Sequence, residues 1–271
     1  MSILDKLREL WQYRELIRNL VRRDLKARYK NSILGIAWSW VNPLLMMLVF
    51  TVVFNFLAGR SDLPNYPIFI LCALLPWNFF SASVNGATGS IVNNAFLVKK
   101  VYFPREVLPI SIVLSNLVNF FMALPVFFLL ALLSGARISP WVLLLPVPIA
   151  IQLVFTIGVC LLLATLDVFF RDTQIIMDVL LLAWFFVTPI FYSISDVPQR
   201  ATILGIEFNA QLWLHRLNPM ASIIASYRDL LYWGAPTALD FLLRTAVTSL
   251  AVLVIGYLVF QHYSPRFSEE V

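Results

Sequence analysis

The chain has 271 residues, of which 60% are apolar and only 13% are charged, and its formal net charge is +5. Because soluble domains usually carry about 45–50% apolar and about 25% charged residues, this composition excludes an ordinary water-soluble domain and indicates a protein embedded in lipid. The apolar residues form continuous blocks near the ~20 residues that a membrane-spanning helix needs, without the alternation of a barrel strand. We therefore predict an all-α membrane protein.

The N-terminal part, residues 1–32, is rich in basic charge and lacks the apolar centre of a signal peptide. Apolar residues recur at helical spacing over residues 3–30, with Arg and Lys between them. This pattern predicts an amphipathic helix lying in the cytoplasmic membrane interface, although a solvated tail that only sets the orientation is the alternative. Membrane orientation explains the basic charge, so no nucleic-acid partner is expected.

Residues 33–271 form a single predicted transmembrane domain with six spans, and no internal repeat is visible. The predicted spans lie near residues 33–58, 67–90, 106–133, 141–166, 175–194 and 241–263. Basic residues before the first span place the N-terminus in the cytoplasm by the positive-inside rule. An even number of spans then places both termini there.

Residues 91–104, between the second and third spans, combine large apolar side chains with Lys99 and Lys100. A simple connector has no need of so much apolar surface facing water, so this segment predicts a docking surface for another protein. The alternative is a helix that lies in the lipid headgroup layer.

Residues 195–240, between the fifth and sixth spans, contain an apolar stretch that is too short to cross a membrane. This stretch, Met220–Leu231, includes Arg228 and Asp229. It directly follows Asn218-Pro219, a pair that interrupts regular helix. Apolar segments of this length often re-enter the membrane, where irregular backbone needs shelter from lipid. We predict two short helices, near residues 209–216 and 219–233, at the outer mouth of a pathway; a structural cap without a gating role is the alternative.

Two predicted spans carry stripes of polar and aromatic residues at helical spacing. The residues are Trp77, Ser81, Asn85 and Thr88 in the second span and Trp184, Thr188 and Tyr192 in the fifth. Polar groups in a span normally face protein or water, and aromatic rings beside hydroxyl and amide groups suit a passing sugar chain. Contacts between helices, or an aromatic belt at the membrane surface, explain the same residues equally well.

Residue types that support catalysis or metal binding are scattered. Cys72 and Cys160 lie in apolar blocks and are expected to be free packing residues, while His215 and His262 lie far apart. The sequence has no phosphate-binding G-x-x-x-x-G-K-[ST] segment and no chain of intramembrane carboxylates such as proton-driven carriers use. We therefore expect no enzyme activity, and any ATP-driven work needs a separate subunit.

Several short segments follow one another in a specific order over nearly the whole chain. They are Arg28–Gly35 after the basic helix, Trp38 with Asn42-Pro43, Leu75–Phe80, Val98–Pro104, Val168–Asp172, Thr188–Ser193 and Leu217–Pro219. In this order and spacing they resemble the membrane (permease) subunits of type-2 ABC exporters for O-antigen, capsular polysaccharide or teichoic acid.

The resemblance implies a homodimer in the bacterial plasma (inner) membrane that surrounds a channel, with two copies of a separate ABC ATPase subunit below it. ATP and magnesium would be bound by the ATPase, so no cofactor is expected in this chain. The implied cargo is a polysaccharide on an undecaprenyl diphosphate carrier. An ion-gradient-driven carrier and a membrane enzyme acting on lipid-linked sugars are the alternatives.

The resemblance also implies roles for particular residues. The two stripes would line the substrate channel, residues 91–104 would form the coupling helix on the ATPase, and residues 195–233 would form the periplasmic gate. The residues implied in coupling to the ATPase are Asn94, Phe96, Leu97, Lys99, Lys100 and Tyr102. Those implied in receiving the lipid headgroup are Arg22, Arg23, Lys26, Arg28 and Lys30. Those implied in the periplasmic gate are Asn218, Pro219, Arg228 and Asp229.

Overall fold

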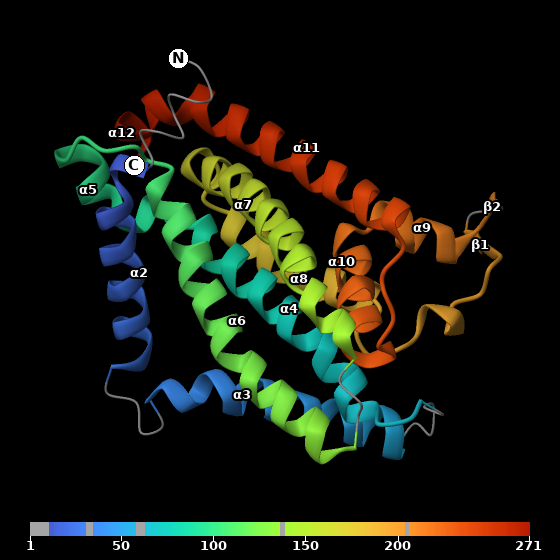
Figure 1. Cartoon of the computed structure of the whole chain (residues 1–271). Coiled ribbons are helices and arrows are strands. Elements are labelled where there is room, and N and C mark those ends of the chain that lie inside the picture. Colours follow the sequence, from blue (N-terminus) through green and yellow to red (C-terminus); the bar gives the residue numbers. More distant parts are fainter. Residues whose placement is uncertain (1–10, 31–34, 58–62, 136–138, 204–205) are drawn as a thin grey trace.

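The computed structural model describes residues 11–30, 35–57, 63–135, 139–203 and 206–271, and most of these are helical (Figure 1). The elements are α2 (Arg14–Tyr29), α3 (Trp38–Phe50), α4 (Tyr66–Thr88), α5 (Ala95–Lys100), α6 (Val107–Leu133), α7 (Pro146–Phe169), α8 (Thr173–Val187), β1 (Ala201–Ile203), β2 (Ile206–Phe208), α9 (Ala210–Leu217), α10 (Pro219–Arg228), α11 (Leu239–Tyr263) and α12 (Phe267–Glu270). Short 3₁₀ turns occupy Gly35–Ala37, Val92–Asn94, Pro140–Leu144, Ile194–Asp196 and Ser264–Arg266, and π-helical turns continue α3 over Thr51–Leu57 and α10 over Asp229–Trp233.

Within the described residues, four helices are long and apolar enough to cross a membrane. They are Tyr66–Thr88, Val107–Leu133, Pro140–Phe169 and Leu239–Glu270, and two shorter apolar helices lie at Trp38–Phe54 and Thr173–Val187. The shorter pair occupies the places of the first and fifth predicted spans. Residues 31–34 and 58–62, at the two ends of the first of these, lie outside the described part of the chain.

The fifth predicted span, near 175–194, is shorter than the sequence pattern indicates. At about 1.5 Å per residue, the 15 residues of α8 extend about 22 Å, which is less than the roughly 30 Å of a hydrocarbon core. The helix ends because Pro189 disfavours helical backbone at the residue before it, and Thr188 is extended with φ −83° and ψ 133°. The last two turns of the predicted span, residues 188–194, are therefore not α-helical.

Helix α4 lies at the centre of the bundle, with α3, α6, α7, α8 and α10 packed around it (Figure 1). It begins after Asn65, whose φ of 52° is left-handed, and Pro67 sits in its first turn, where a missing N–H is tolerated. In its most apolar window 78% of the residues are buried, against 17% in α11, which lies on the outside. A helix that is apolar on all sides is expected to be enclosed in this way.

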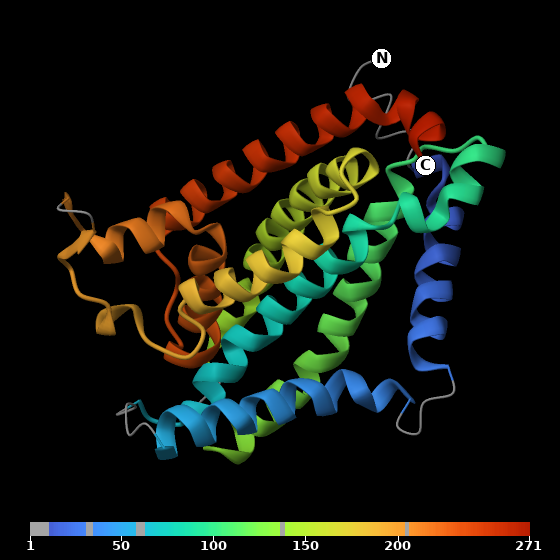
Figure 2. The ribbon, with the colours of Figure 1, turned by 180° about the vertical axis from the view of Figure 1, so that it is seen from behind.

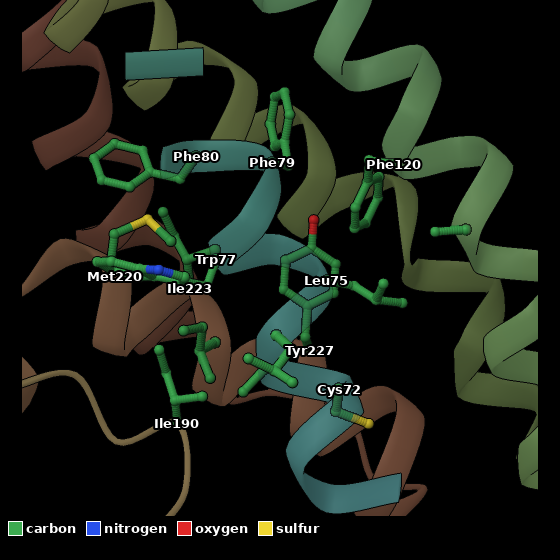
Figure 3. Close-up of a cluster of buried hydrophobic side chains, with 14 of the residues drawn as sticks. Cys72, Leu75, Trp77, Phe79, Phe80, Phe120, Ile190, Met220, Ile223 and Tyr227 are labelled. Atoms are coloured by element: carbon green, nitrogen blue, oxygen red, sulfur yellow. The ribbon is translucent and has the colours of Figure 1, made fainter. Parts of the chain in front are cut away.

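The short helix α10 is inserted among α4, α7 and α11 (Figure 2). Its side chains Met220, Ile223 and Tyr227 join Phe80 of α4 in the larger of two hydrophobic cores (Figure 3). The Tyr227 hydroxyl donates a 2.8 Å hydrogen bond to Gln152 Oε1 on α7. The apolar character of α10 thus reflects burial among other helices.

The segment between α8 and α10 departs in part from the all-helical prediction. Strands β1 and β2 pair antiparallel, with Ala201 opposite Phe208 and Ile203 opposite Ile206. Strands of three residues are too short for a periodicity to reveal. The two short helices predicted near 209–216 and 219–233 are present as α9 and α10 with its π-helical continuation.

A second hydrophobic core lies at the end of the bundle where α2, α5, α7, α11 and α12 meet, which we call the α5 end (Figure 1). Leu20 of α2, Val98 of α5, Phe260 of α11 and Phe267 of α12 are buried there. The apolar face of α2 packs against the bundle and α2 lies along α6. Packing therefore fixes both the amphipathic helix and the predicted coupling segment.

Candidate functional site

The two predicted stripes meet inside the bundle. The Trp77 ring of α4 lies edge-on to the Trp184 ring of α8, with centroids 6.5 Å apart. Trp77 and Thr88 are buried, and the Thr88 hydroxyl donates to the Val84 carbonyl of its own helix at 2.7 Å. Ser81 is half-buried and Asn85 is exposed, so these two are the members of the α4 stripe that reach the surface.

Three polar side chains form a closed network where α8 ends and α10 begins. Trp184 Nε1 donates to Asn218 Oδ1 at 2.8 Å, and Asn218 Nδ2 donates to Thr188 Oγ1 at 3.0 Å. The Thr188 hydroxyl in turn donates to the Trp184 carbonyl at 2.7 Å. Thr188 is fully buried and Trp184 is half-buried, so both residues of the predicted stripe link helices in this conformation.

Asn218 also caps α10. Its Oδ1 accepts the backbone N–H groups of Met220 and Ala221 at 3.1 and 3.3 Å, and Pro219 occupies the first helical position. These are the groups that an N-terminal cap satisfies at the start of a helix. Since the same oxygen accepts from Trp184, the start of α10 is tied directly to α8.

Tyr192 stands beside this network at the rim of a cavity of about 540 Å³ that Trp184, Val187, Leu214 and Asn218 also line. The Tyr192 hydroxyl donates to the Val187 carbonyl at 3.0 Å, and the side chain is half-buried. Of the α8 stripe, Tyr192 and the partly exposed Trp184 are therefore the members that face open space.

Arg228, predicted as a gate residue, is a buried cation at the end of α10. It is 6% exposed, and its two terminal nitrogens donate to the carbonyl oxygens of Pro189 and Ile190 at 2.5 and 2.6 Å. The guanidinium also lies 3.6 Å from the centroid of the Phe69 ring. These carbonyls follow the end of α8, so Arg228 satisfies backbone groups that the broken helix leaves free. The adjoining Asp229 side chain accepts a hydrogen bond from Thr237.

The segment 91–104, predicted to couple to a partner, forms a short knob at the α5 end. Val98 is buried and anchors α5, whereas Phe96 and Tyr102 are 66% and 95% exposed. The Lys100 ammonium lies 4.4 Å from the centroid of the Phe96 ring. Lys99 is exposed and Leu97 is half-buried. The knob therefore presents an aromatic and basic surface on a firm apolar base.

The C-terminal segment braces this knob from behind. The Arg105 guanidinium donates to the Ser264 carbonyl and, at 3.4 Å, to the Ser268 hydroxyl. Burial lowers the pKa of Arg105 from its ordinary value, and the nearby Glu106 carboxylate partly offsets this effect. A cavity of about 540 Å³ lies between residues 98–106 and the C-terminal segment. The sequence pattern did not reveal this brace, because nothing local to residues 264–271 marks a tertiary contact.

The basic residues of α2 divide into two groups. Arg22, Arg23, Lys26 and Lys30 are exposed. Arg28 is exposed as well, but it donates to Asn116 Oδ1 on α6 at 2.8 Å and pairs with Asp24 at 3.3 Å, one turn earlier in α2. Arg23 Nη2 donates to Asn94 Oδ1 at 3.2 Å, so one predicted lipid-receiving residue contacts one predicted coupling residue. Asn116 was missed by the sequence analysis, although an amide within an apolar span is a usable signal.

Within the described part of the chain, no group of three or more His, Cys, Asp and Glu side chains is arranged to hold a metal. Cys72 and Cys160 are buried free thiols. Apolar helices of spanning length, together with polar groups sheltered inside the bundle, define a polytopic membrane protein.

Comparison with known proteins identifies the kind of transporter. The model of the family described as ABC-2 type transporter matches residues 15–232, and the chain belongs to this family. The chain is 38% identical over 265 residues to the O-antigen export system permease protein of Myxococcus xanthus, covering 98% of both chains. It is 32% identical over 256 residues to a protein of the same description from Klebsiella pneumoniae, covering 94% of both chains.

A more distant relative is the polysialic acid transport protein of Escherichia coli, at 23% identity over 253 residues, with 89% of this chain and 91% of the relative covered. The relatives are transporter components and not enzymes. The chain is accordingly a permease of the ABC-2 type, and the resemblance read from the sequence is confirmed at the level of the family.

Proposed function

We propose that this permease is the membrane subunit of an ATP-driven exporter that moves lipid-linked polysaccharide across the bacterial inner membrane. The observation that carries the proposal is end-to-end similarity to permeases whose descriptions name O-antigen export, with a further relative described as transporting polysialic acid. An undecaprenyl diphosphate carrier is part of the proposal because such a polymer needs a lipid anchor to reach a membrane pathway.

The working assembly in this proposal is a homodimer with two ATPase subunits, six spans in each chain and both termini in the cytoplasm. The two short helices carry exposed apolar side chains, which either lipid or a second copy would cover. Leu45, Leu48 and Val49 of α3 are 50–57% exposed and Ile175, Val179 and Leu182 of α8 are 60–67% exposed. Helix α8, with 15 residues, is shorter than a full span, so shelter of its end by a neighbouring chain suits it.

The knob of residues 91–104 is the proposed contact with the ATPase. The side chains of Phe96 and Tyr102 are largely exposed. Large aromatic side chains of this kind are typical of the centres of protein interfaces. Closure of the ATPase on ATP would push α5, and the buried Val98 would pass that movement to the helices around it. In this chain ATP and magnesium have no proposed site, because the partner holds them.

The pathway itself is proposed to run past the surface-reaching members of the two stripes, Ser81, Asn85, Trp184 and Tyr192. Trp77, Thr88 and Thr188 are buried within the chain and would meet the polymer only when helices separate. Such a path offers weak, repeated contacts along which a sugar chain can advance. The network of Asn218 and the carbonyl caps of Arg228, with Pro219 and Asp229 beside them, would hold the outer end closed between transport steps.

Reception of the lipid headgroup is proposed for the exposed basic residues of α2. Arg22, Arg23, Lys26 and Lys30 could attract the diphosphate, and each basic residue near an anionic membrane contributes about 1 kcal/mol. Arg28 would act less through free charge, because it is paired with Asp24.

The test is reconstitution of the permease with its ATPase in vesicles that contain lipid-linked polysaccharide. Export that depends on ATP hydrolysis supports the proposal. Export without an ATPase that stops when an ion gradient is collapsed would instead establish an ion-driven carrier. Chemical alteration of the lipid-linked sugar by the purified permease would establish the membrane-enzyme alternative.

A further inference from the structure

The C-terminal segment, residues 264–271, lies against two loops that are far apart in the sequence (Figure 1). One loop is the knob of residues 91–104, and the other is the turn between α7 and α8, residues 170–172. In the proposed orientation both loops face the cytoplasm. The segment therefore joins the place where an ATPase would push to the place where α8 begins.

The first attachment joins the segment to the knob. The Arg105 guanidinium, directly after the knob, donates to the Ser264 carbonyl and, at 3.4 Å, to the Ser268 hydroxyl. Val98 of α5 and Phe267 of α12 are buried together in the core of the α5 end. Because close-packed cores transmit displacement, α5 cannot move away from the segment without opening this core.

The second attachment joins the segment to the turn between α7 and α8. Arg171 Nη2 donates to the Glu270 carbonyl at 3.2 Å. The ring of Phe169, the last residue of α7, lies edge-on to the Phe267 ring, with centroids 6.3 Å apart. It also lies edge-on to the Tyr263 ring at the end of α11, at 5.4 Å. The same buried side chain, Phe267, therefore serves both attachments.

Helix α8 is the element that such a link can displace. It packs mainly against α4 and α7, and its side chains Ile175 and Val179 are exposed. Its start is fastened to the end of α7, because the Asp167 carboxylate accepts a hydrogen bond from the Gln174 backbone N–H. A movement of the turn is therefore passed to α8, the helix that includes Trp184 of the proposed pathway.

A second route from the knob to α8 runs through α4 and bypasses the C-terminal segment. Gln174 Nε2 donates to the Asn85 carbonyl, near the end of α4, at 3.2 Å. Helix α4 leads directly into the turn that opens the knob. The two routes use different side chains, so substitutions can separate them.

We propose that the C-terminal segment is a strut that passes ATP-driven movement of the knob to the start of α8, with Arg105 and Arg171 as positioning residues at its two ends. The inference rests on the proposed function and adds to it the connection by which an ATPase acts on a helix of the substrate pathway. Both arginines donate to main-chain carbonyl oxygens of the segment, so they fix its backbone in place.

The central experiment is a double-mutant cycle in the reconstituted complex of permease and ATPase, with export per ATP hydrolysed as the measured ratio. Arg105→Met and Arg171→Met each release one end of the strut. When two bonds hold the same strut, breaking either one is enough to release it. We therefore expect each single variant to lower the ratio several-fold and the double variant to lower it no further.

Two further variants complete the cycle. Gln174→Leu removes the bond to the Asn85 carbonyl and leaves both ends of the strut in place. Its loss should multiply with that of Arg171→Met, because the two variants act on separate routes. Arg266→Met, which replaces an exposed arginine of the same segment, is the matched control and should keep the ratio of the unmodified complex.

Movement of α8 can also be followed directly. Asp178→Cys places a thiol for an environment-sensitive fluorophore at an exposed position near the start of α8, while Cys72 and Cys160 are buried. The emission should change when a non-hydrolysable ATP analogue binds the complex. This change should be largely lost in Arg171→Met and kept in Arg266→Met. Unchanged ATP hydrolysis in both variants would show that the ATPase remains bound.

The inference is overturned if the losses of Arg105→Met and Arg171→Met multiply, or if either variant keeps the full ratio. It is also overturned if the fluorophore on α8 responds equally in Arg171→Met and in the unmodified chain. ATP-dependent export by the unmodified complex in any of these cases leaves the proposed function standing. Lack of export by the unmodified complex would count against the proposed function itself.

Discussion

Gly256 of α11 and Gly158 of α7 lie in backbone contact: a Cβ atom on Gly256 would stand 2.2 Å from the carbonyl oxygen of Gly158. In the reverse direction, a Cβ atom on Gly158 would stand 2.6 Å from the Leu253 Cα atom. Small residues let membrane helices approach this closely, and dispersion contacts over the shared surface hold them together. The α7–α11 pair is also the most extensively packed pair of helices in the described structure.

Gly256→Ala is therefore expected to destabilise the protein by about 1–3 kcal/mol, since the new methyl group meets backbone that cannot yield without moving a whole helix. Thermal unfolding in detergent would measure this. Gly86→Ala is the matched control, because its Cβ would meet only the Cγ2 atom of the Ile112 side chain, at 2.9 Å. Equal melting temperatures for the two variants would contradict the close packing of α7 and α11.

The positions of the long helices were predictable because continuous apolar sequence leaves few choices in lipid. Helix α6, Val107–Leu133, lies within one residue of the predicted span 106–133. Pro189 predicts a distorted last turn in the fifth span, but the end of α8 at Val187 was not predicted, because apolar residues continue beyond it. Hydropathy indicates whether a segment prefers lipid or water, whereas the backbone conformation at one position depends on single residues such as Pro189.

The sequence indicated which residue types form the candidate site, but it indicated less about how these residues are arranged in space. The stripes left Trp77 and Trp184 open between a channel lining, which the resemblance implied, and contacts between helices, and their rings contact one another inside the chain. Which face of a helix meets a neighbour depends on tertiary packing that one sequence does not contain. The amides Asn116 and Asn119 of α6 were missed because two amides in a 27-residue apolar helix resemble ordinary contacts between helices.

Asn218→Ala is expected to lower stability by about 2 kcal/mol, since it removes the N-terminal cap of α10 and the acceptor for the Trp184 indole. Thermal unfolding in detergent measures this loss. Asn209→Ala is the control, because Asn209 caps only α9, accepting from Leu212 at 3.0 Å, and is exposed. If both variants lose the same stability, the link between α8 and α10 contributes nothing.

Arg228→Lys is expected to lower stability by about 1.5–3 kcal/mol, because one ammonium cannot serve the Pro189 and Ile190 carbonyls and also lie flat on Phe69. A drop in melting temperature in detergent checks this. Arg216→Lys, at an exposed position on α9, should leave stability within about 0.5 kcal/mol. Unchanged stability in Arg228→Lys would show that the carbonyls find other partners.

Tyr192→Ala is expected to slow export several-fold in the reconstituted complex while leaving the fold intact, since the ring is half-exposed at a cavity and its hydroxyl bonds only to nearby backbone. Trp184→Ala would also slow export but would unfold at lower temperature, because its ring packs on Phe80 and Phe155. Export rates and melting temperatures together separate the two effects. Full export by Tyr192→Ala would remove this residue from the pathway.

Arg105→Met tests whether the C-terminal brace transmits movement from α5. The variant loses the bonds to Ser264 and Ser268, so the knob should rest less firmly on the segment behind it. We expect the ATPase still to bind, because Phe96 and Tyr102 remain exposed, while export per ATP hydrolysed falls several-fold. Parallel assays of ATP hydrolysis and export measure that ratio.

Arg266→Gln, an exposed neighbour in the same segment, should keep the ratio of the unmodified complex. A ratio that is unchanged in Arg105→Met as well would mean that coupling passes through Val98 and the apolar base of the knob alone.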